Sequence, residues 1–167
     1  CRTLDQMRSR ILADVAVAAA ENDPKKGVAL VVIDFLQRAK ASQRTTDGNR
    51  DDEERVYEAK GIANDANVPV LAVSSMTKVA QNLATNEGKV DVTGTKGAGT
   101  EYAADVVVFL VREKDGDSYR PKVVFNIVKR RGGPLSAPVL IFDLARGTFS
   151  SDGPVRREGA VPASAHD

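Results

Sequence analysis

The residues best suited to chemistry in this chain stand where apolar runs end. Asp34 closes the run over residues 28–33, whose apolar character on both faces is typical of a central parallel strand. Open α/β sheets bind ligands at the carboxyl ends of such strands. A carboxylate there can hold Mg²⁺ through water while nucleotide phosphates complete the coordination, which is the physical content of a Walker B motif. An acid that caps a nearby loop gives the same pattern, so both interpretations stay open here.

Polar side chains also follow the next apolar run and a later turn. Ser74 and Ser75 come after the run over residues 68–73. Their hydroxyls could bond a phosphate, a metal-bound water or, as we favour, the first turn of the following helix. Lys129 and Arg131 lie two residues apart, so in an extended chain they point to the same side. Such a pair suits a phosphate site, and a solvated basic edge is the alternative.

The composition limits the functions that these residues can serve. Lys and Arg total 24 and Asp and Glu total 23, so the net charge of +1 excludes a strongly basic arm or an acidic tail. One Cys and one His exclude an internal disulfide and a cysteine-rich metal site, and they disfavour His-based catalysis. The absence of Trp argues against a base-stacking platform. Because no apolar run could cross a bilayer and no signal peptide opens the chain, we expect a cytoplasmic protein without a membrane partner.

The elements that must position these residues follow from the apolar periodicity. Helices are predicted over residues 4–22, 51–67 and 76–83. Strands are predicted over residues 28–34, 68–74, 105–111, 122–129 and 137–143, the first three of them buried. This order describes an α/β fold whose sheet begins parallel and finishes in antiparallel hairpin strands. We expect polar loops over 38–50 and 86–99, one domain over 1–150 and a disordered tail over 151–167.

Five stretches in this order resemble the RecA-like ATPase domain of DnaB-type replicative helicases. They are V-V-I-D-F-L-Q (31–37), N-R (49–50), N-V-P-V-L-A-V-S-S (67–75), E-Y-A-A-D-V-V-V-F-L (101–110) and K-R-R-G-G-P (129–134). The likeness covers about residues 3 to 150. It implies a RecA-like P-loop NTPase core with ATP and Mg²⁺ as cofactors. The implied activity is that of a helicase motor of DNA replication, which couples ATP hydrolysis at the subunit interfaces of a ring to translocation on single-stranded DNA.

The resemblance also implies roles for individual residues in ATP hydrolysis. Asp34 matches the Walker B acid that organises Mg²⁺ at ATP. Ser75 stands where the family has a Gln that senses the γ-phosphate. Lys129 and Arg131 match the basic pair that reaches the neighbouring subunit's γ-phosphate, where it stabilises the charge that develops in phosphoryl transfer.

Two loops match those that face single-stranded DNA in the central channel of the ring. Arg38 and Arg50 bound the first loop, and Lys89 and Lys96 lie in the second. We expect these four side chains to contact DNA phosphates, although a solvated role for the two lysines is nearly as well supported. The resemblance therefore implies a homo-oligomer, in the family a hexameric ring, and it makes a primase or a helicase loader a candidate partner.

The chain also departs from the family pattern. No G-x-x-x-x-G-K-[ST] motif occurs in it, because Gly88-Lys89 is followed by Val90 and lacks the upstream glycine. The family's catalytic glutamate lies before the first helix, and Ser75 is too short to replace the sensing Gln. Residues 95–98, T-K-G-A, replace the family's R-E-S-G. We favour the C-terminal part of a longer ATPase whose nucleotide loop precedes Cys1, inactive by itself, over a P-loop-less module for DNA binding or subunit assembly.

Two further alternatives can be weighed. Another RecA-like ATPase, such as a recombinase-like or plasmid-replication protein, shares the fold, but the L-Q after Asp34 and the K-x-R-G-G-P turn favour the replicative type. A phosphorylation-receiver domain also places an Asp, a Ser and a Lys at successive strand ends. That fold needs a pair of acids after an earlier strand, no strand is predicted before Val28, and the hairpin near Asp115 breaks its strict alternation.

Overall fold

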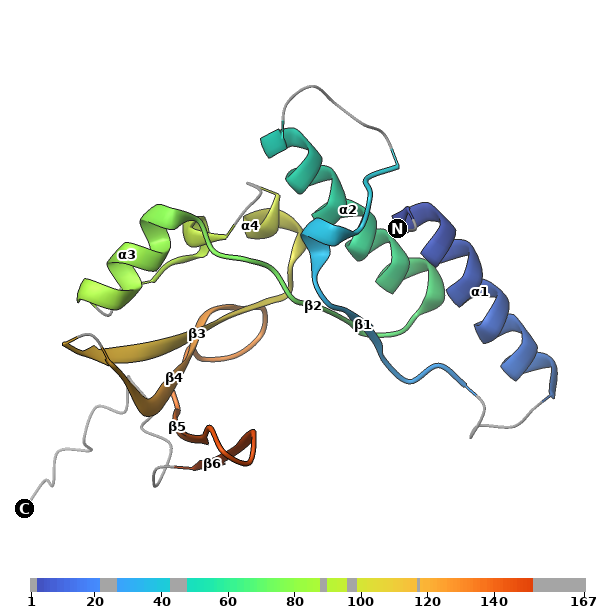
Figure 1. Ribbon diagram of the computed structural model, residues 1–167. Helices are drawn as coiled ribbons and strands as arrows, with labels where there is room; N and C mark the ends of the chain where they lie inside the picture. Colours follow the sequence, from blue (N-terminus) through green and yellow to red (C-terminus); the bar gives the residue numbers. More distant parts are fainter. Residues whose placement is uncertain are drawn as a thin grey trace, which may run out of the picture. The chain divides into compact units, whose positions relative to one another are not determined.

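The computed structural model describes residues 3–21, 27–42, 48–87, 90–95, 99–116 and 118–151 (Figure 1). The helices are α1 (Leu4–Glu21), α2 (Gly48–Ala66), α3 (Lys78–Glu87) and α4 (Thr100–Ala103), with short 3-10 turns η1 (Leu36–Arg38) and η2 (Val92–Gly94). The strands are β1 (Val31–Ile33), β2 (Val70–Ala72), β3 (Val106–Asp115), β4 (Ser118–Arg130), β5 (Val139–Asp143) and β6 (Thr148–Ser151). The chain divides into two compact units, residues 1–77 with 93–104 and residues 78–92 with 105–167.

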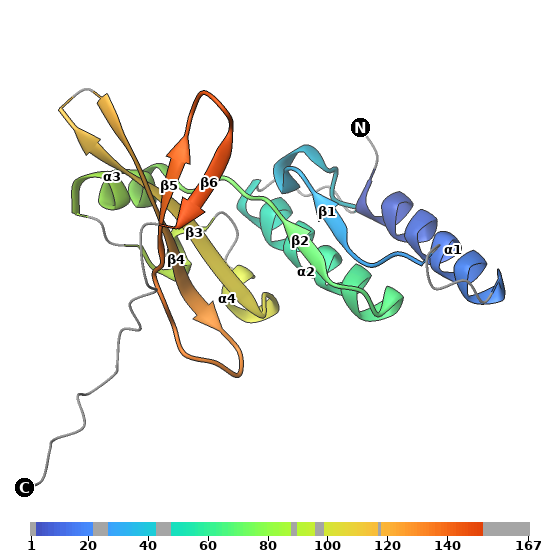
Figure 2. The same ribbon diagram turned by 90° about the horizontal axis from the view of Figure 1, so that it is seen from below.

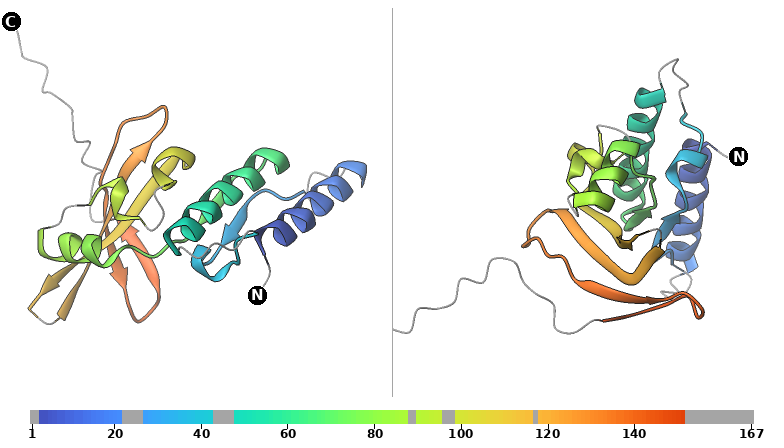
Figure 3. Two further views of the ribbon diagram at one scale, coloured as in Figure 1. Left: turned by 90° about the horizontal axis from the view of Figure 1, so that it is seen from above. Right: turned by 60° about the vertical axis from the view of Figure 1, so that its left-hand side comes forward.

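The first unit is a parallel strand pair packed on two helices. β1 and β2 pair with Val31 opposite Val70 and Ile33 opposite Ala72, and α1 and α2 lie side by side (Figures 2 and 3). The buried core contains one residue from each of α1 and β1, two from α2 and two from the segment after β1. These are Leu4, Ile33, Leu36, Ala39, Ala59 and Ile62. Both long helices that the apolar periodicity predicted therefore contribute to this core.

Local sequence explains where α1 begins and how it meets α2. Thr3 and Gln6 form a reciprocal capping box, in which the Gln6 N–H donates to Thr3 Oγ1 at 3.3 Å and the Thr3 N–H donates to Gln6 Oε1 at 3.2 Å. An ion pair between Arg8 and Asp65 then joins α1 to α2. These contacts fix the helix pair that supports β1 and β2.

Ile62 is the residue whose truncation should cost the first unit most. Its side chain is 1% exposed and belongs to the core beneath β1. We expect Ile62→Ala to lower the free energy of unfolding by about 2–5 kcal/mol, since the lost burial is compounded by the cavity left behind. Urea unfolding of the chain measures this loss. Val17→Ala on α1, where Val17 is 56% exposed, is the matched control and should change stability by less than ~0.5 kcal/mol. An equal loss in both variants would contradict this account of the core.

The second unit is an antiparallel sheet in the order β3-β4-β5-β6, with α3 packed against β3 (Figure 2). Val107, Phe109 and Val111 of β3 are buried, whereas Val106 and Leu110 are exposed. Residues 105–111 were expected to form a buried strand, and among the described residues only one of its two rows of side chains is buried. The alternation is that of an antiparallel strand with one covered face. The hairpin expected near Gly116, which adopts a φ of +59°, is confirmed.

The α/β fold class, parallel first and antiparallel afterwards, is confirmed, with four differences. The described strands form two sheets, and β1 and β2 are three residues long, shorter than predicted. α2 begins at Gly48, inside the expected loop over 38–50. β6 was not expected: the Asp143 carboxylate accepts the N–H groups of Ala145 and Arg146, and the resulting turn returns the chain to β5. Residues 152–167 of the expected tail lie outside the described residues.

One expectation concerns the membrane. Within the described ranges, none of the helices combines the length and the apolar character that a membrane crossing requires.

Candidate functional site

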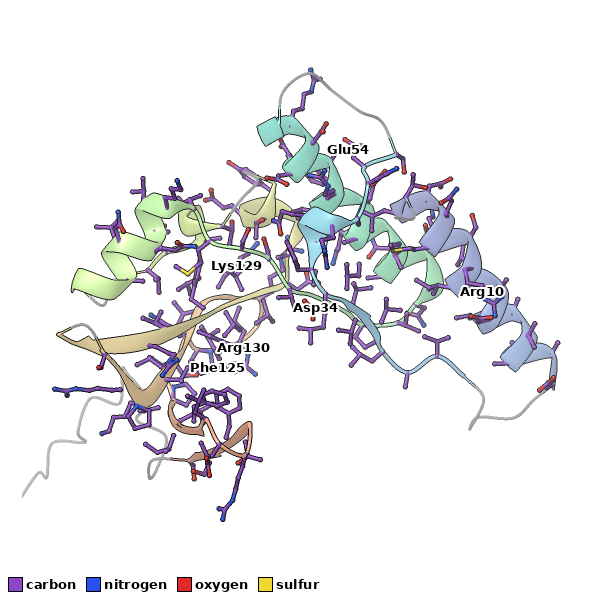
Figure 4. All side chains as sticks on the ribbon, in the orientation of Figure 1. Arg10, Asp34, Glu54, Phe125, Lys129 and Arg130 are labelled. Carbon is purple, nitrogen blue, oxygen red and sulfur yellow. The ribbon has the colours of Figure 1, made fainter. Side chains whose placement is uncertain are left out.

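Asp34 lies where the sequence places it, at the carboxyl end of β1. Its side chain is exposed, and the next peptide bond, between Asp34 and Phe35, is cis. Two main-chain hydrogen bonds continue the strand pair past its last residues: the Val73 N–H donates to Ile33 O at 2.9 Å, and the Leu36 N–H donates to Val73 O at 2.8 Å. Asp34 stands at the end of β1 (Figure 4), and because the strands are parallel, the serines after β2 share its edge of the sheet.

The side chain of Gln37 links the two strand ends. Its Nε2 donates to Ser74 Oγ at 2.8 Å, while its Oε1 accepts the Ser75 N–H at 3.3 Å. Gln37 supported the family resemblance through the V-V-I-D-F-L-Q stretch and the L-Q pair after Asp34, but no structural role was predicted for it. The one available signal was its place three residues after a strand-end acid.

The helix-cap interpretation of the serines is wrong for Ser74. Its hydroxyl accepts the Gln37 amide and donates toward Ser75 O at 3.4 Å. α3 begins at Lys78, so Thr77 and neither serine stands directly before it. Within the described part of the chain, the hydroxyl of Ser75 forms no hydrogen bond. Ser75 therefore presents a polar group at the same edge as Asp34.

The one acidic side chain at this edge, Asp34, limits how a cation could be held there. Among the described residues, no three His, Cys, Asp or Glu side chains gather closely enough to hold a metal ion. Asp34 alone cannot form a protein cage for a cation. Mg²⁺ is commonly bound through one or two carboxylates together with substrate phosphates and waters. The single exposed carboxylate therefore fits a Mg²⁺ ion that arrives with a nucleotide.

Lys129 and Arg131 lie in the second unit, at the end of β4. Lys129 is opposite Val107, and Arg131 lies one residue beyond the strand, so strand alternation does not set the direction of its side chain. Arg131 is tied to Asp105 twice: its N–H donates to Asp105 O at 2.9 Å, and its guanidinium meets the Asp105 carboxylate at 3.1 Å. The side chains of Arg131 and Asp105 are each more than half exposed. The sequence analysis did not foresee this pairing between two of the family-like stretches.

Of the two glycines after Arg131, the first is required by its backbone conformation, and the second lies close to a flexible side chain. Gly132 has a φ of +76°, a conformation that costs other residues free energy. A Cβ added to Gly133 would lie 2.7 Å from Nε of Arg130, so that guanidinium packs where a side chain would otherwise stand. Gly132 thus permits the turn that follows Arg131.

Two of the four residues that were expected to contact DNA, Arg38 and Arg50, lie within the described part of the chain. Arg38 ends η1, is exposed, and lies over the Phe35 ring with 5.9 Å between the guanidinium carbon and the ring centroid. Arg50 is exposed in the first turn of α2. Lys89 and Lys96 lie outside the described residues.

Arg55 and Glu58 of α2, to which the sequence gave no role, hold the start of the expected loop over residues 38–50. Arg55 Nε donates to Ala39 O at 2.9 Å, and the same guanidinium pairs with Asp52 at 2.6 Å. The Ser42 N–H donates to Glu58 Oε1 at 3.0 Å. Because these contacts come from a rigid helix, the chain that leaves η1 has a fixed path as far as Ser42.

Comparison with known proteins identifies the family to which this arrangement belongs. The family model described as the DnaB-like helicase C terminal domain matches residues 3–151. A solved ATPase domain has a TM-score of 0.72 and 20% identity over 90% of this chain and 51% of its own. A second structure, described as a DnaB-like replicative helicase and its interactions with primase, has a TM-score of 0.71 and 21% identity over 89% of this chain and 34% of its own. A search of curated proteins found no match.

These findings have different weights. At 20% and 21% identity the two structures show the fold, which is that of RecA-like ATPase domains. The chain spans 51% of the length of the first and 34% of the second. The family model, in contrast, matches nearly all of the chain and includes every described strand. The chain belongs to the family of DnaB-like helicase C-terminal domains.

Proposed function

We propose that this chain is part of the ATP-dependent motor of a replicative DNA helicase and works within a longer ATPase. The observation that carries the proposal is the edge of the parallel strand pair, where Asp34 and Ser75 stand together in a member of this family. Such an edge is where open α/β sheets bind ligands. Residues 1–150 would form the partial ATPase domain.

The residues at this edge suit Mg²⁺–ATP. Asp34 would hold a water of the Mg²⁺ shell, and the hydroxyl of Ser75 would reach a phosphate or a metal-bound water. When bound, Mg²⁺ supplies neutralisation of the charge that builds on the phosphates during transfer. Asp34 keeps the ion at the strand end, and the main-chain bonds between the two strands keep Asp34 and Ser75 at one edge.

A bare apolar face supports a further segment as the source of the phosphate-binding loop. Leu30, Val32, Leu71 and Val73 alternate along the two strands on the face opposite the core, and they are 44% to 56% exposed. Parallel sheets are covered on both faces, because bare apolar surface is costly in water. The solved ATPase domain is also about twice as long as this chain's match to it. We propose that polypeptide beyond these 167 residues covers this face and carries the loop.

The basic pair at the end of β4 suits action between subunits. Lys129 and Arg131 would reach a γ-phosphate bound by the neighbouring protomer of a ring, as the family likeness of K-R-R-G-G-P suggests. The Arg131 side chain is more than half exposed, and the fork of N–H donors on a guanidinium matches the geometry of a phosphate. One solved relative is described with its interactions with primase, which makes a primase a candidate partner here.

Single-stranded DNA binding gives a prediction of its own. If Arg50 contacts a DNA phosphate, Arg50→Ala should weaken binding and reduce the slope of log K against log salt by about 0.7. Fluorescence anisotropy with a labelled oligonucleotide, titrated at several salt concentrations, measures the slope. Arg10→Ala, which removes a solvent-side arginine paired with Asp14 on α1, is the control and should leave it unchanged. Equal slopes in all three proteins would remove Arg50 from the DNA interface.

The experiment that tests the proposed function begins with the coding sequence around this chain. The complete reading frame should contain a G-x-x-x-x-G-K-[ST] motif, and its product should hydrolyse ATP faster when single-stranded DNA is added. The alternative is a P-loop-less module. It would bind single strands in a salt-sensitive manner, hydrolyse no ATP, and lack the motif throughout its reading frame.

A further inference from the structure

The amide of Gln37 ties together the segments that follow β1 and β2. It donates to Ser74 Oγ at 2.8 Å and accepts the Ser75 N–H at 3.3 Å, so both of its ends are engaged at once. Gln37 lies in η1, whose first residue is itself bonded to Val73 O. The short turn after Asp34 and the segment after β2 are thus connected through main chain and side chain.

The chemistry of this contact permits one orientation of the amide. The Ser75 N–H needs an acceptor, and the oxygen of Gln37 supplies it. A reversed amide would set its NH₂ group against that N–H, donor against donor. The Ser74 hydroxyl, which can both accept and donate, accommodates the amide nitrogen and bonds toward Ser75 O. The contact is therefore specific for a side chain with an acceptor of this length.

We propose that Gln37 is a positioning residue that holds Ser75 at a fixed place relative to Asp34. This inference rests on the proposed ATPase function and deepens it: a movement of the turn after Asp34 is transmitted through the Gln37 amide to the Ser75 backbone. The hydroxyl of Ser75 forms no hydrogen bond within the described residues, so its place depends on the Ser75 backbone, whose N–H is held by Gln37 at 3.3 Å and whose carbonyl accepts from the Ser74 hydroxyl at 3.4 Å. Positioning of this kind affects the rate of reaction more than the affinity for substrate.

Amide hydrogen exchange tests the contact itself, without reference to any activity. Gln37→Met keeps the length of the side chain and removes both hydrogen bonds. In the complete ATPase we expect the Ser75 amide to exchange about fivefold faster in this variant, the factor that corresponds to one neutral hydrogen bond. Gln37→Glu should keep the amide protected, because a carboxylate accepts from the Ser75 N–H and from the Ser74 hydroxyl. Asn64→Ala, on the exposed side of α2, is the control and should leave exchange unchanged.

Kinetics of the complete ATPase test the role in positioning. Gln37→Met should lower kcat for ATP hydrolysis about tenfold, with KM for ATP within about twofold of the wild-type value. A residue that only stabilises the fold would lower the melting temperature and leave kcat per folded molecule unchanged. Ser74→Ala removes one of the two links and should give a smaller fall in kcat.

The outcomes separate this inference from the proposed function. If Ser75 exchanges at the same rate in Gln37→Met and wild type, the link is absent and the inference is overturned, whatever the ATPase does. Faster exchange with an unchanged kcat would show a link without a positioning role, and it would also overturn the inference. If the complete wild-type protein hydrolyses no ATP, it is the proposed function that fails, and this is seen before any variant is made.

Discussion

Asp34→Ala is expected to lower the rate of ATP hydrolysis by the complete ATPase by at least about 100-fold, since the ion that neutralises phosphate charge loses its protein ligand. Asp34→Asn keeps the shape of the side chain and should be nearly as inactive, because the charge is what holds the cation. The side chain is exposed, so neither variant should change the free energy of unfolding by more than ~0.5 kcal/mol. Steady-state hydrolysis with saturating single-stranded DNA, beside urea unfolding of the same samples, measures both quantities.

A matched control separates loss of the ligand from loss of any surface acid. Asp14→Ala removes a carboxylate from α1 that forms a solvent-exposed ion pair with Arg10 at 3.0 Å. This variant should leave ATP hydrolysis unchanged. If Asp34→Ala hydrolyses ATP as fast as Asp14→Ala, the cation is held elsewhere. Asp34 would then be the strand-end acid of the simpler interpretation.

The two long helices were predictable because their signal is local. Leu4 and Ile62 are both 1% exposed, and each belongs to an apolar series with helical spacing that can be read without knowing the rest of the fold. The strands were less predictable. Residues 105–111 are apolar at nearly every position, yet β3 has one buried and one exposed row, because other elements among the described residues cover only one of its faces. A continuous apolar run does not reveal which of its faces another layer will cover.

The same limit applies to the candidate site. That Asp34 and Ser75 share an edge could be inferred, since parallel strands bring their carboxyl ends together. The contacts of Gln37 with Ser75 and of Arg131 with Asp105 could not, because they join residues 38 and 26 positions apart through side-chain geometry. Such pairs depend on the registry of segments that only the folded chain defines. The sequence therefore indicated the strand-end residues Asp34 and Ser75 but not the polar side chains that contact the candidate residues.

Arg131→Ala is expected to lower hydrolysis about 1,000-fold in the assembled ring while leaving nucleotide binding by each protomer unchanged, because the guanidinium would act on the neighbour's phosphate. The lost ion pair with Asp105 is more than half exposed on both sides, so stability should change little. Arg146→Ala, which removes an exposed arginine near Asp143, is the control and should be fully active. Hydrolysis rates and nucleotide affinities measured on the same rings test each part.

Mixed rings decide whether Arg131 acts across the subunit boundary. Neither Asp34→Ala nor Arg131→Ala rings should hydrolyse ATP alone. In a ring of both, an interface where an Arg131→Ala protomer binds ATP beside an Asp34→Ala protomer has both groups intact. A random equal mixture contains such interfaces at about one in four, so activity should return to roughly a quarter of the wild-type level. An arginine that acts within its own protomer leaves every site in the mixture short of one group, and the mixture then stays inactive.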